Sequence, residues 1–401
     1  MLFFLYPQNR APRRLTEGET AMAKQQTSHA YRNLVVIMIV LLVLAALCWV
    51  GKDLVNKAKE EQLAQNTAAV AEENAKRQQA YETAKKEADQ QNKQNEPVPA
   101  QRPKPKGEGW EVLDLSDFPV SNSRQVTVSR EDLLLGGMVL VNHWHALPSD
   151  YSSILTQLTG VHTSQNKIQV DSSSVRAFPT VVSAIAEMLA GAKEAGYEYY
   201  IIKEAFRSEE KQQSYWDEEI ARYADKLSGE TLENKARESV NKPGTSEYQT
   251  GFAFRVDRYK EGDKEFMDHK FQNMEMSDWL LAHSWEYGII FRFPVQGYPN
   301  ATVTDKSYKT GESKMLSIYR YVGKANAAVM HAMNFCMEEY IEYLIEHPHI
   351  AVYENGTLKY EIVRTEAADP YGSAKVSVSK SVTDYVASTD NMGGVIVAMS
   401  Y

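Results

Sequence analysis

The pattern of hydrophobic and polar positions changes sharply along the first quarter of the chain. Residues 34–50, LVVIMIVLLVLAALCWV, form an uninterrupted apolar run. A helix that spans a membrane needs about 20 apolar residues, so this run and its flanks predict a transmembrane helix over 33–51. The alternative is a cleaved signal peptide. The run is longer than the usual signal-peptide core of about 7–15 residues, and no clear A-x-A site follows it, which favours a single-pass anchor.

Charged residues around the apolar run predict its orientation. Arg and Lys outnumber Glu before the run, so residues 1–32 are expected to form a cytoplasmic N-terminal segment. Lysines soon after the run weaken this bias. Met22, followed by AKQQ, is an alternative start to Met1. The expected location is the cell membrane, with the C-terminal bulk of the chain outside the cytoplasm.

Polar residues that favour a helix follow the apolar run. Residues 52–95 are mostly Ala, Gln, Glu, Lys and Asn, and nothing breaks a helix before Pro97. This composition predicts a solvated helical stalk, about 65 Å long if it is helical throughout. Disorder is the alternative. Residues 96–109, EPVPAQRPKPKGEG, then predict a Pro-rich linker.

Helix-type and strand-type patterns intermix beyond residue 110, without the regular rhythm of a parallel sheet. The expected helices span 178–195, 208–227, 264–286 and 324–346, and the expected strands span 197–206, 289–294 and 317–323. Ser208 is expected to cap the second helix, and a late hairpin is expected to turn at Asn355 and Gly356. The mixture predicts an α+β fold, with a globular domain over 110–347 and a C-terminal β-rich appendage over 348–401.

Composition and charge narrow the classes of function. The net charge of −9 and the lack of a basic cluster with interleaved aromatics argue against a nucleic-acid partner. The two cysteines are Cys48, inside the apolar run, and Cys336. A disulfide between them is therefore not expected, and zinc sites of the CxxC type are excluded.

Four blocks between residues 140 and 323 carry a resemblance to a known family. They are LVNHWHALPSDY (140–151), EAFRSEEKQ (204–212), PGTSEYQTGFAFRV (243–256), and WLLAHSWEYGIIFRFP followed by TGESKMLSIYRYVG. In this order the blocks resemble the VanY-type D-alanyl-D-alanine carboxypeptidases, zinc peptidases that trim the stem peptides of peptidoglycan. The resemblance extends from Leu140 to Gly323 and implies a VanY/Hedgehog-type peptidase-like domain.

The resemblance also implies a catalytic zinc with three protein ligands and a glutamate beside the metal-bound water. In this chain the first His ligand, the Asp ligand, the base Glu and the second His ligand are replaced by Tyr248, Arg255, Met315 and Ile318. A phenol titrates near pH 10, a guanidinium has no lone pair to offer a metal, and the other two side chains cannot act as base or ligand. The histidines at 269, 283 and 331 lack metal-ligand spacing. The sequence therefore predicts no metal and no cofactor for this member, although the family uses zinc.

Part of the family's substrate-binding pattern is retained. Arg207, Gln212 and Ser246 match family positions, and the resemblance implies that Arg207 engages the polar end of the substrate or the developing oxyanion. The alternative is that Arg207 pairs with a local acid such as Glu204 or Glu210. Arg255 could stand in for the zinc charge by pairing with Asp257 or with a bound carboxylate.

These patterns predict a membrane-anchored, extracytoplasmic and non-catalytic D-alanyl-D-alanine carboxypeptidase-like protein. Its expected partner is a peptidoglycan stem peptide or an envelope protein. One alternative is an active cell-wall D,D-carboxypeptidase with an unrecognised site. The other is a structural scaffold whose old cleft is plugged by Tyr248, Met315 and Ile318.

Overall fold

A computed structural model describes residues 101–382 and 384–401, together with residues 57, 76, 79 and 83. The chain divides into two units, Met1–Ala100 and Gln101–Tyr401. None of the helices in the described part of the chain has the length and apolar character needed to cross a membrane. The expected transmembrane helix over 33–51 lies outside the described residues, as does nearly all of the expected stalk.

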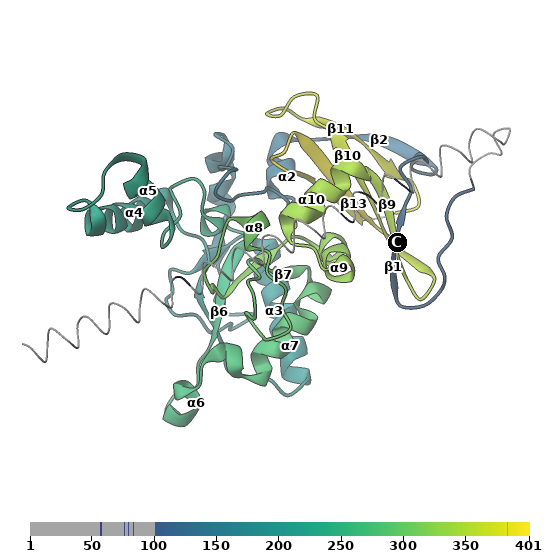
Figure 1. Cartoon of the computed structure of the whole chain (residues 1–401). Helices are drawn as coiled ribbons and strands as arrows, with labels where there is room; N and C mark the ends of the chain where they lie inside the picture. The colour runs from purple at the N-terminus through teal and green to yellow at the C-terminus, as the bar shows by residue number, and fades with distance from the viewer. Residues whose placement is uncertain (1–56, 58–75, 77–78, 80–82, 84–100, 383) are drawn as a thin grey trace, which may run out of the picture. The chain divides into compact units, whose positions relative to one another are not determined.

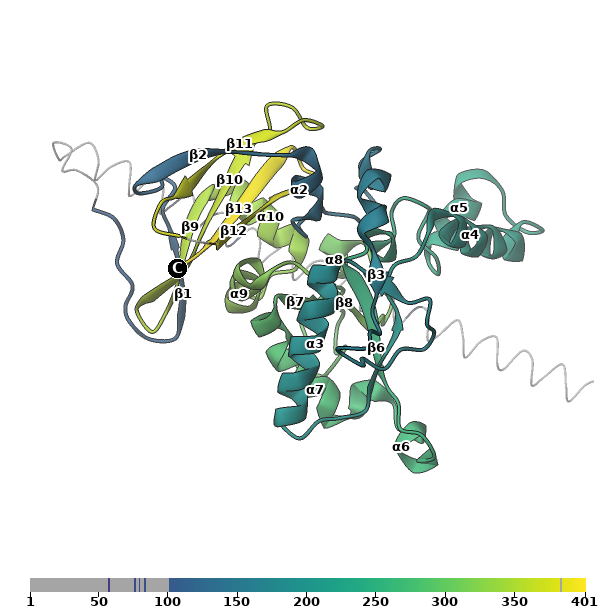
Figure 2. The same ribbon diagram turned by 180° about the vertical axis from the view of Figure 1, so that it is seen from behind.

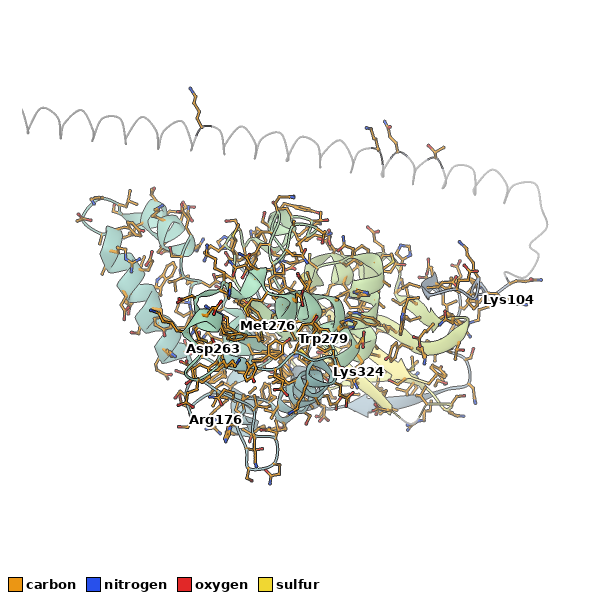
Figure 3. The ribbon with its side chains drawn as sticks, turned by 90° about the horizontal axis from the view of Figure 1, so that it is seen from below. Lys104, Arg176, Asp263, Met276, Trp279 and Lys324 are labelled. Atoms are coloured by element: carbon orange, nitrogen blue, oxygen red, sulfur yellow. The ribbon has the colours of Figure 1, made fainter. Side chains whose placement is uncertain are left out.

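A four-stranded antiparallel sheet is the centre of the peptidase-like part of the second unit. The strand order is β5 (Tyr200–Glu204), β6 (Ala253–Arg258), β8 (Ile318–Tyr321) and β7 (Ile289–Phe291). Helices α3 (Pro179–Glu194) and α7 (Glu275–His283) pack with this sheet around one hydrophobic core (Figure 2). Met276 is buried in this core, and Trp279 packs against it (Figure 3). Residues far apart in the sequence thus form one continuous core.

A second, five-stranded antiparallel sheet contains most of the C-terminal residues (Figure 1). Its order is β1 (Trp110–Asp114), β9 (His349–Glu354), β10 (Thr357–Glu366), β13 (Gly394–Ser400) and β12 (Asp384–Thr389). A two-stranded ribbon of β2 (Ser123–Val128) and β11 (Ala374–Ser379) accompanies it. Successive side chains of β13 point to opposite faces of the sheet, as the pleat of a strand requires.

The two faces of the five-stranded sheet are covered by different elements. Ile396 and Ala398 pack in a core that includes residues of α9 (Lys324–Met333) and α10 (Met337–Glu346). Val395, Val397 and Met399 pack instead in the core that contains Val376 and Val378 of the ribbon. A separate appendage over 348–401 is therefore wrong, because β1 and β2 come from residues 110–128 and both pair with C-terminal strands.

The remaining elements are α4 (Glu209–Tyr223), with 15 residues, and several shorter helices and strands. The shorter ones are α2 (Arg130–Leu135), η1 (Tyr151–Gln157), β3 (Thr159–Gly160), β4 (Arg176–Ala177), α5 (Gly229–Arg237), η2 (Glu247–Thr250), α6 (Lys264–Asp268), η3 (Phe271–Asn273), η4 (Ser284–Tyr287) and α8 (Ser307–Thr310). The mixed helix-and-sheet class that the sequence predicts is confirmed.

Local signals predict some of the elements well and others poorly. The first expected helix is α3, and Ser208 caps α4 by accepting a hydrogen bond from the backbone N–H of Lys211. The hairpin of β9 and β10 turns at Asn355 and Gly356, which both have positive φ as such a turn requires.

Two expected helices are each divided. The helix expected over 324–346 is wrong because Asn334, at φ 51°, ends α9 in a left-handed conformation before α10 begins. The helix expected over 264–286 is interrupted where His269 and Met274 adopt extended backbone angles. Short polar stretches between apolar positions allow these breaks, which a purely periodic pattern does not reveal.

Candidate functional site

The stretch after Gly244 makes a sharp turn that brings Tyr248 beside the central sheet. A buried 3-10 helix, η2, ends at Gly251, whose φ of +73° allows the chain to enter β6. A Cβ atom at this position would lie 2.8 Å from the Phe178 ring. Position 251 therefore requires glycine, because of both its backbone angle and its close packing.

The positions that correspond to the family's three metal ligands converge in space. Arg255 on β6 is the Cα partner of Ile318 on β8. Tyr248 and Ile318 pack in one small apolar cluster with Ala253 and Phe293. The fold thus brings these positions together. Tyr248 and Ile318 make hydrophobic contact there, and the Arg255 side chain stays half exposed.

The residues at these positions do not fit a zinc ion. Burial raises the pKa of the Tyr248 phenol far above neutrality, so its oxygen keeps its proton. Arg255 carries a fixed positive charge, and Ile318 has no donor atom. Within the described residues, no group of three or more His, Cys, Asp or Glu side chains could hold a metal ion.

Arg207 is held by its neighbours. Its Nε and Nη2 atoms donate to the carboxylate of Glu204 at 3.0 and 2.7 Å, and its Nη1 donates to Gln212 Oε1 at 2.7 Å. The guanidinium carbon lies 4.4 Å from the centroid of the Tyr248 ring and 4.8 Å from that of Tyr215. Of the two interpretations of Arg207, the structure therefore shows the local pair, with Glu204 as the acid.

Of the three predicted substrate-binding residues, Gln212 and Ser246 are buried and Arg207 is half-buried. Gln212 is fully buried and donates to the carbonyl of Asn241, and Ser246 is 3% exposed at the start of η2. Arg207, Gln212 and Ser246 are absent from the lining of the cleft beside Tyr248. Direct contact between them and a ligand stays a prediction.

An open cleft of about 340 Å³ lies beside Tyr248 and Arg255. Its other lining residues are Val256, Asp257, Arg258, Lys270, Phe271, Gln272, Tyr298, Met315, Leu316 and Ser317. Met315 is 65% exposed, so it does not plug the cleft as a scaffold would need. Tyr248 and Ile318, in contrast, are buried, as that interpretation expects.

Positive charge predominates among the described side chains that line the cleft. Three of the charged side chains are cationic and one, Asp257, is anionic. Arg258 donates to Asp257 Oδ1 at 2.6 Å and to the carbonyl of Met267 at 2.7 Å. Arg255 Nη2 lies 3.9 Å from Asp257 Oδ2, too far for a hydrogen bond, and its side chain is 49% exposed. The cleft is therefore suited to an anion.

A buried network of charges supports the loop that carries Tyr248, and the sequence analysis missed it. Glu247 accepts hydrogen bonds from Arg292 and Arg320, and Arg292 binds Glu338 of α10 through two bonds of 2.7 and 2.9 Å. Arg292 and Arg320 are fully buried. The available signal was the presence of arginines inside the apolar strand segments IIFRFP and SIYRYVG, because a buried charge needs a partner.

Comparison with known proteins identifies the domain. Residues 175–308 match the family model described as VanY, D-alanyl-D-alanine carboxypeptidase. A D-alanyl-D-alanine carboxypeptidase of Enterococcus faecalis is 30% identical over 230 residues, which are 57% of this chain and 74% of that protein. The putative carboxypeptidase YodJ of Bacillus subtilis is 30% identical over 206 residues, covering 51% of this chain and 67% of that protein.

The fold is similar to that of a solved peptidase structure. The crystal structure of the vancomycin resistance D,D-dipeptidase VanXYg aligns with a TM-score of 0.53 and 20% identity, over 70% of this chain and 99% of that chain. At this level of identity the likeness concerns the fold alone. On the identity with the enterococcal and Bacillus proteins, the chain belongs to the VanY family of D-alanyl-D-alanine carboxypeptidases.

Proposed function

We propose that this domain binds stem peptides of peptidoglycan without hydrolysing them. The carrying observation is that the family's ligand positions still converge beside an open cleft but hold Tyr248, Arg255 and Ile318. The relatives are named D-alanyl-D-alanine carboxypeptidases, so the stem peptide of peptidoglycan is the proposed ligand. An envelope protein with a similar exposed peptide end is the second partner class.

The chemistry of the cleft supports binding without hydrolysis. Peptide hydrolysis needs a group that activates water and a group that stabilises the developing oxyanion. Asp257 is the only carboxylate among the cleft-lining residues that the structure describes, and Arg258 already donates to it. Met315 stands where the family has its base. The cleft retains cations for recognition and lacks a free base.

Binding and hydrolysis are tested together on the full chain. We expect a stem pentapeptide to bind saturably in calorimetry and no D-alanine to be released over hours. Ser317→Phe, which fills the cleft, is expected to weaken binding at least tenfold. Ser313→Phe adds the same ring to an exposed residue outside the cleft lining and is expected to change nothing. Release of D-alanine would identify an active peptidase, and absence of any binding would favour the scaffold.

We also propose that a single helix over 33–51 anchors the domain outside the cytoplasm, followed by the stalk over 52–95 and the linker over 96–109. The support is the apolar run and the charge bias before it. The full chain is expected to stay with membranes in alkaline carbonate and to dissolve in detergent. Deletion of residues 34–50 is expected to release it. A full chain that carbonate extracts would contradict the anchor.

A further inference from the structure

Two carboxylates lie near Arg255, and each already accepts hydrogen bonds from another arginine. Its Cα partner on β5 is Glu204, whose two oxygens accept hydrogen bonds from Arg207. The other nearby acid is Asp257, which Arg258 binds at 2.6 Å. Among the described residues, no acceptor lies within hydrogen-bond distance of the Arg255 guanidinium. Its planar donor fork is therefore free to bind an anion that enters the cleft.

Other groups around Arg255 favour a carboxylate. Lys270 adds a second cation to the cleft lining, and Tyr298 and Tyr248 add phenols. Burial raises the pKa of both phenols, so each keeps a proton that it can donate. Arginine binds a carboxylate through two parallel hydrogen bonds, and such charge-assisted bonds are about twice as strong as neutral ones.

The position of Arg255 indicates which carboxylate it would meet. In a zinc carboxypeptidase the metal polarises the carbonyl of the bond that is cut. Hydrolysis converts this carbonyl into the terminal carboxylate of the shortened peptide. The resemblance assigns a metal ligand to the position of Arg255. A peptide bound as in the family's enzymes would bring a neutral carbonyl to this cation before trimming and a negative charge after it.

We propose that the cleft recognises the trimmed peptide, with its new terminal carboxylate on Arg255, in preference to the uncut peptide that the family's enzymes cleave. This inference rests on the proposed function, because it names the peptide that the same cleft binds. The ligand is a stem tetrapeptide that ends in one D-alanine. The protein would then bind the product that carboxypeptidases leave in the cell wall.

The test compares three peptides on the full chain by calorimetry: the stem pentapeptide, the tetrapeptide and the tetrapeptide carboxamide. We expect the tetrapeptide to bind about 10- to 100-fold more tightly than the other two, the range that a hydrogen bond to a charged group supplies. Arg255→Gln is expected to remove this preference, and Arg255→Lys to keep part of it. Arg124→Gln, at an exposed arginine on β2, is the matched control and is expected to keep all of it.

The outcomes separate this inference from the proposed function. A pentapeptide can place its own terminal carboxylate on Arg255 only by shifting one residue along the cleft. Equal affinity for pentapeptide and tetrapeptide, or for acid and carboxamide, would overturn the inference and leave peptide binding intact. Competition by inorganic phosphate as strong as that by the tetrapeptide would overturn the assignment to a peptide carboxylate. If no peptide binds, the proposed function fails, and the inference fails with it.

Discussion

Arg255 and Ile318 are Cα partners on the neighbouring antiparallel strands β6 and β8. Cα atoms of directly opposed residues in such a pair are about 4.5–5.5 Å apart. The resemblance assigns a ligand Asp and a ligand His to these two positions. The backbone therefore presents the two positions together, with an arginine and an isoleucine in place of the two ligands that the resemblance implies.

Restoring the four family residues is expected to restore zinc binding. The quadruple variant Tyr248→His, Arg255→Asp, Met315→Glu and Ile318→His should bind about one zinc per chain, because a three-ligand site needs only that its ligands converge. Mass spectrometry of the dialysed protein measures the metal. The triple variant that keeps Ile318 is the control and should hold much less. A quadruple variant that folds and holds no more zinc than the triple variant would refute the convergence of these positions.

The buried network between η2 and α10 is expected to be essential for stability. Arg292→Met leaves the carboxylates of Glu247 and Glu338 without their shared cation, so it should lower the free energy of unfolding by about 3–5 kcal/mol. Denaturant unfolding measures the change. Lys324→Met breaks an exposed pair with Glu187, 3.0 Å apart, and should cost no more than about 1 kcal/mol (Figure 3). Equal costs for the two variants would contradict the role of the network.

Acid is expected to weaken the same network. Burial alone would raise the pKa of Glu338, but the charge of Arg292 and hydrogen bonds from Arg292 and Asn142 outweigh it and hold the pKa below its ordinary value. The native state then binds fewer protons than the unfolded state, whose Glu pKa is about 4.3. The contribution of Glu338 is complete above that value and is lost as the pH falls through the lower, folded pKa.

Unfolding titrations between pH 7 and pH 3 measure this dependence. The free energy of unfolding should be nearly level at the upper end and decline below about pH 5. Glu338→Gln should be less stable at pH 7 and should show a shallower decline, because it has one fewer proton to gain. A variant whose decline is as steep as that of the wild type would assign the acid sensitivity to other carboxylates.

The tight turn before β6 is expected to tolerate no side chain. Gly251 and Gly262 have nearly the same positive φ, +73° and +75°, but only Gly251 is crowded. Gly262→Ala should cost about 1–2 kcal/mol for the backbone strain. Gly251→Ala should cost that amount and roughly 1–3 kcal/mol more, because the new Cβ meets Phe178 and Leu158. Equal losses in denaturant unfolding would show that packing at Gly251 is unimportant.

The sequence predicts the cleft better than it predicts the partners of individual residues. The family blocks place Tyr248, Arg255 and Ile318 at one site, and the pairing of β6 with β8 brings the last two together. The sequence does not decide whether Arg207 pairs with Glu204 or with Glu210, because both are close enough along the chain to reach it. Only the three-dimensional structure distinguishes them.

Long-range pairing explains most of what the sequence did not predict. Strands β1 and β2 bind C-terminal strands that lie more than 200 residues away, and no local pattern encodes such a partner. The Arg292 network is similar, because Glu247 and Glu338 are distant in sequence and each appears as an ordinary charged residue. Local patterns do predict α3, the Ser208 cap and the turn at Asn355, which depend on neighbouring residues alone.

The most direct test of the central claim is the zinc content of the wild-type full chain, measured together with D-alanine release. After dialysis against excess zinc and then against buffer, the protein should hold far less than one zinc per chain and should release no D-alanine from a stem pentapeptide. This follows from the side chains at Tyr248, Arg255 and Ile318, which offer no ligand. About one zinc per chain, with D-alanine release that EDTA abolishes, would contradict the account.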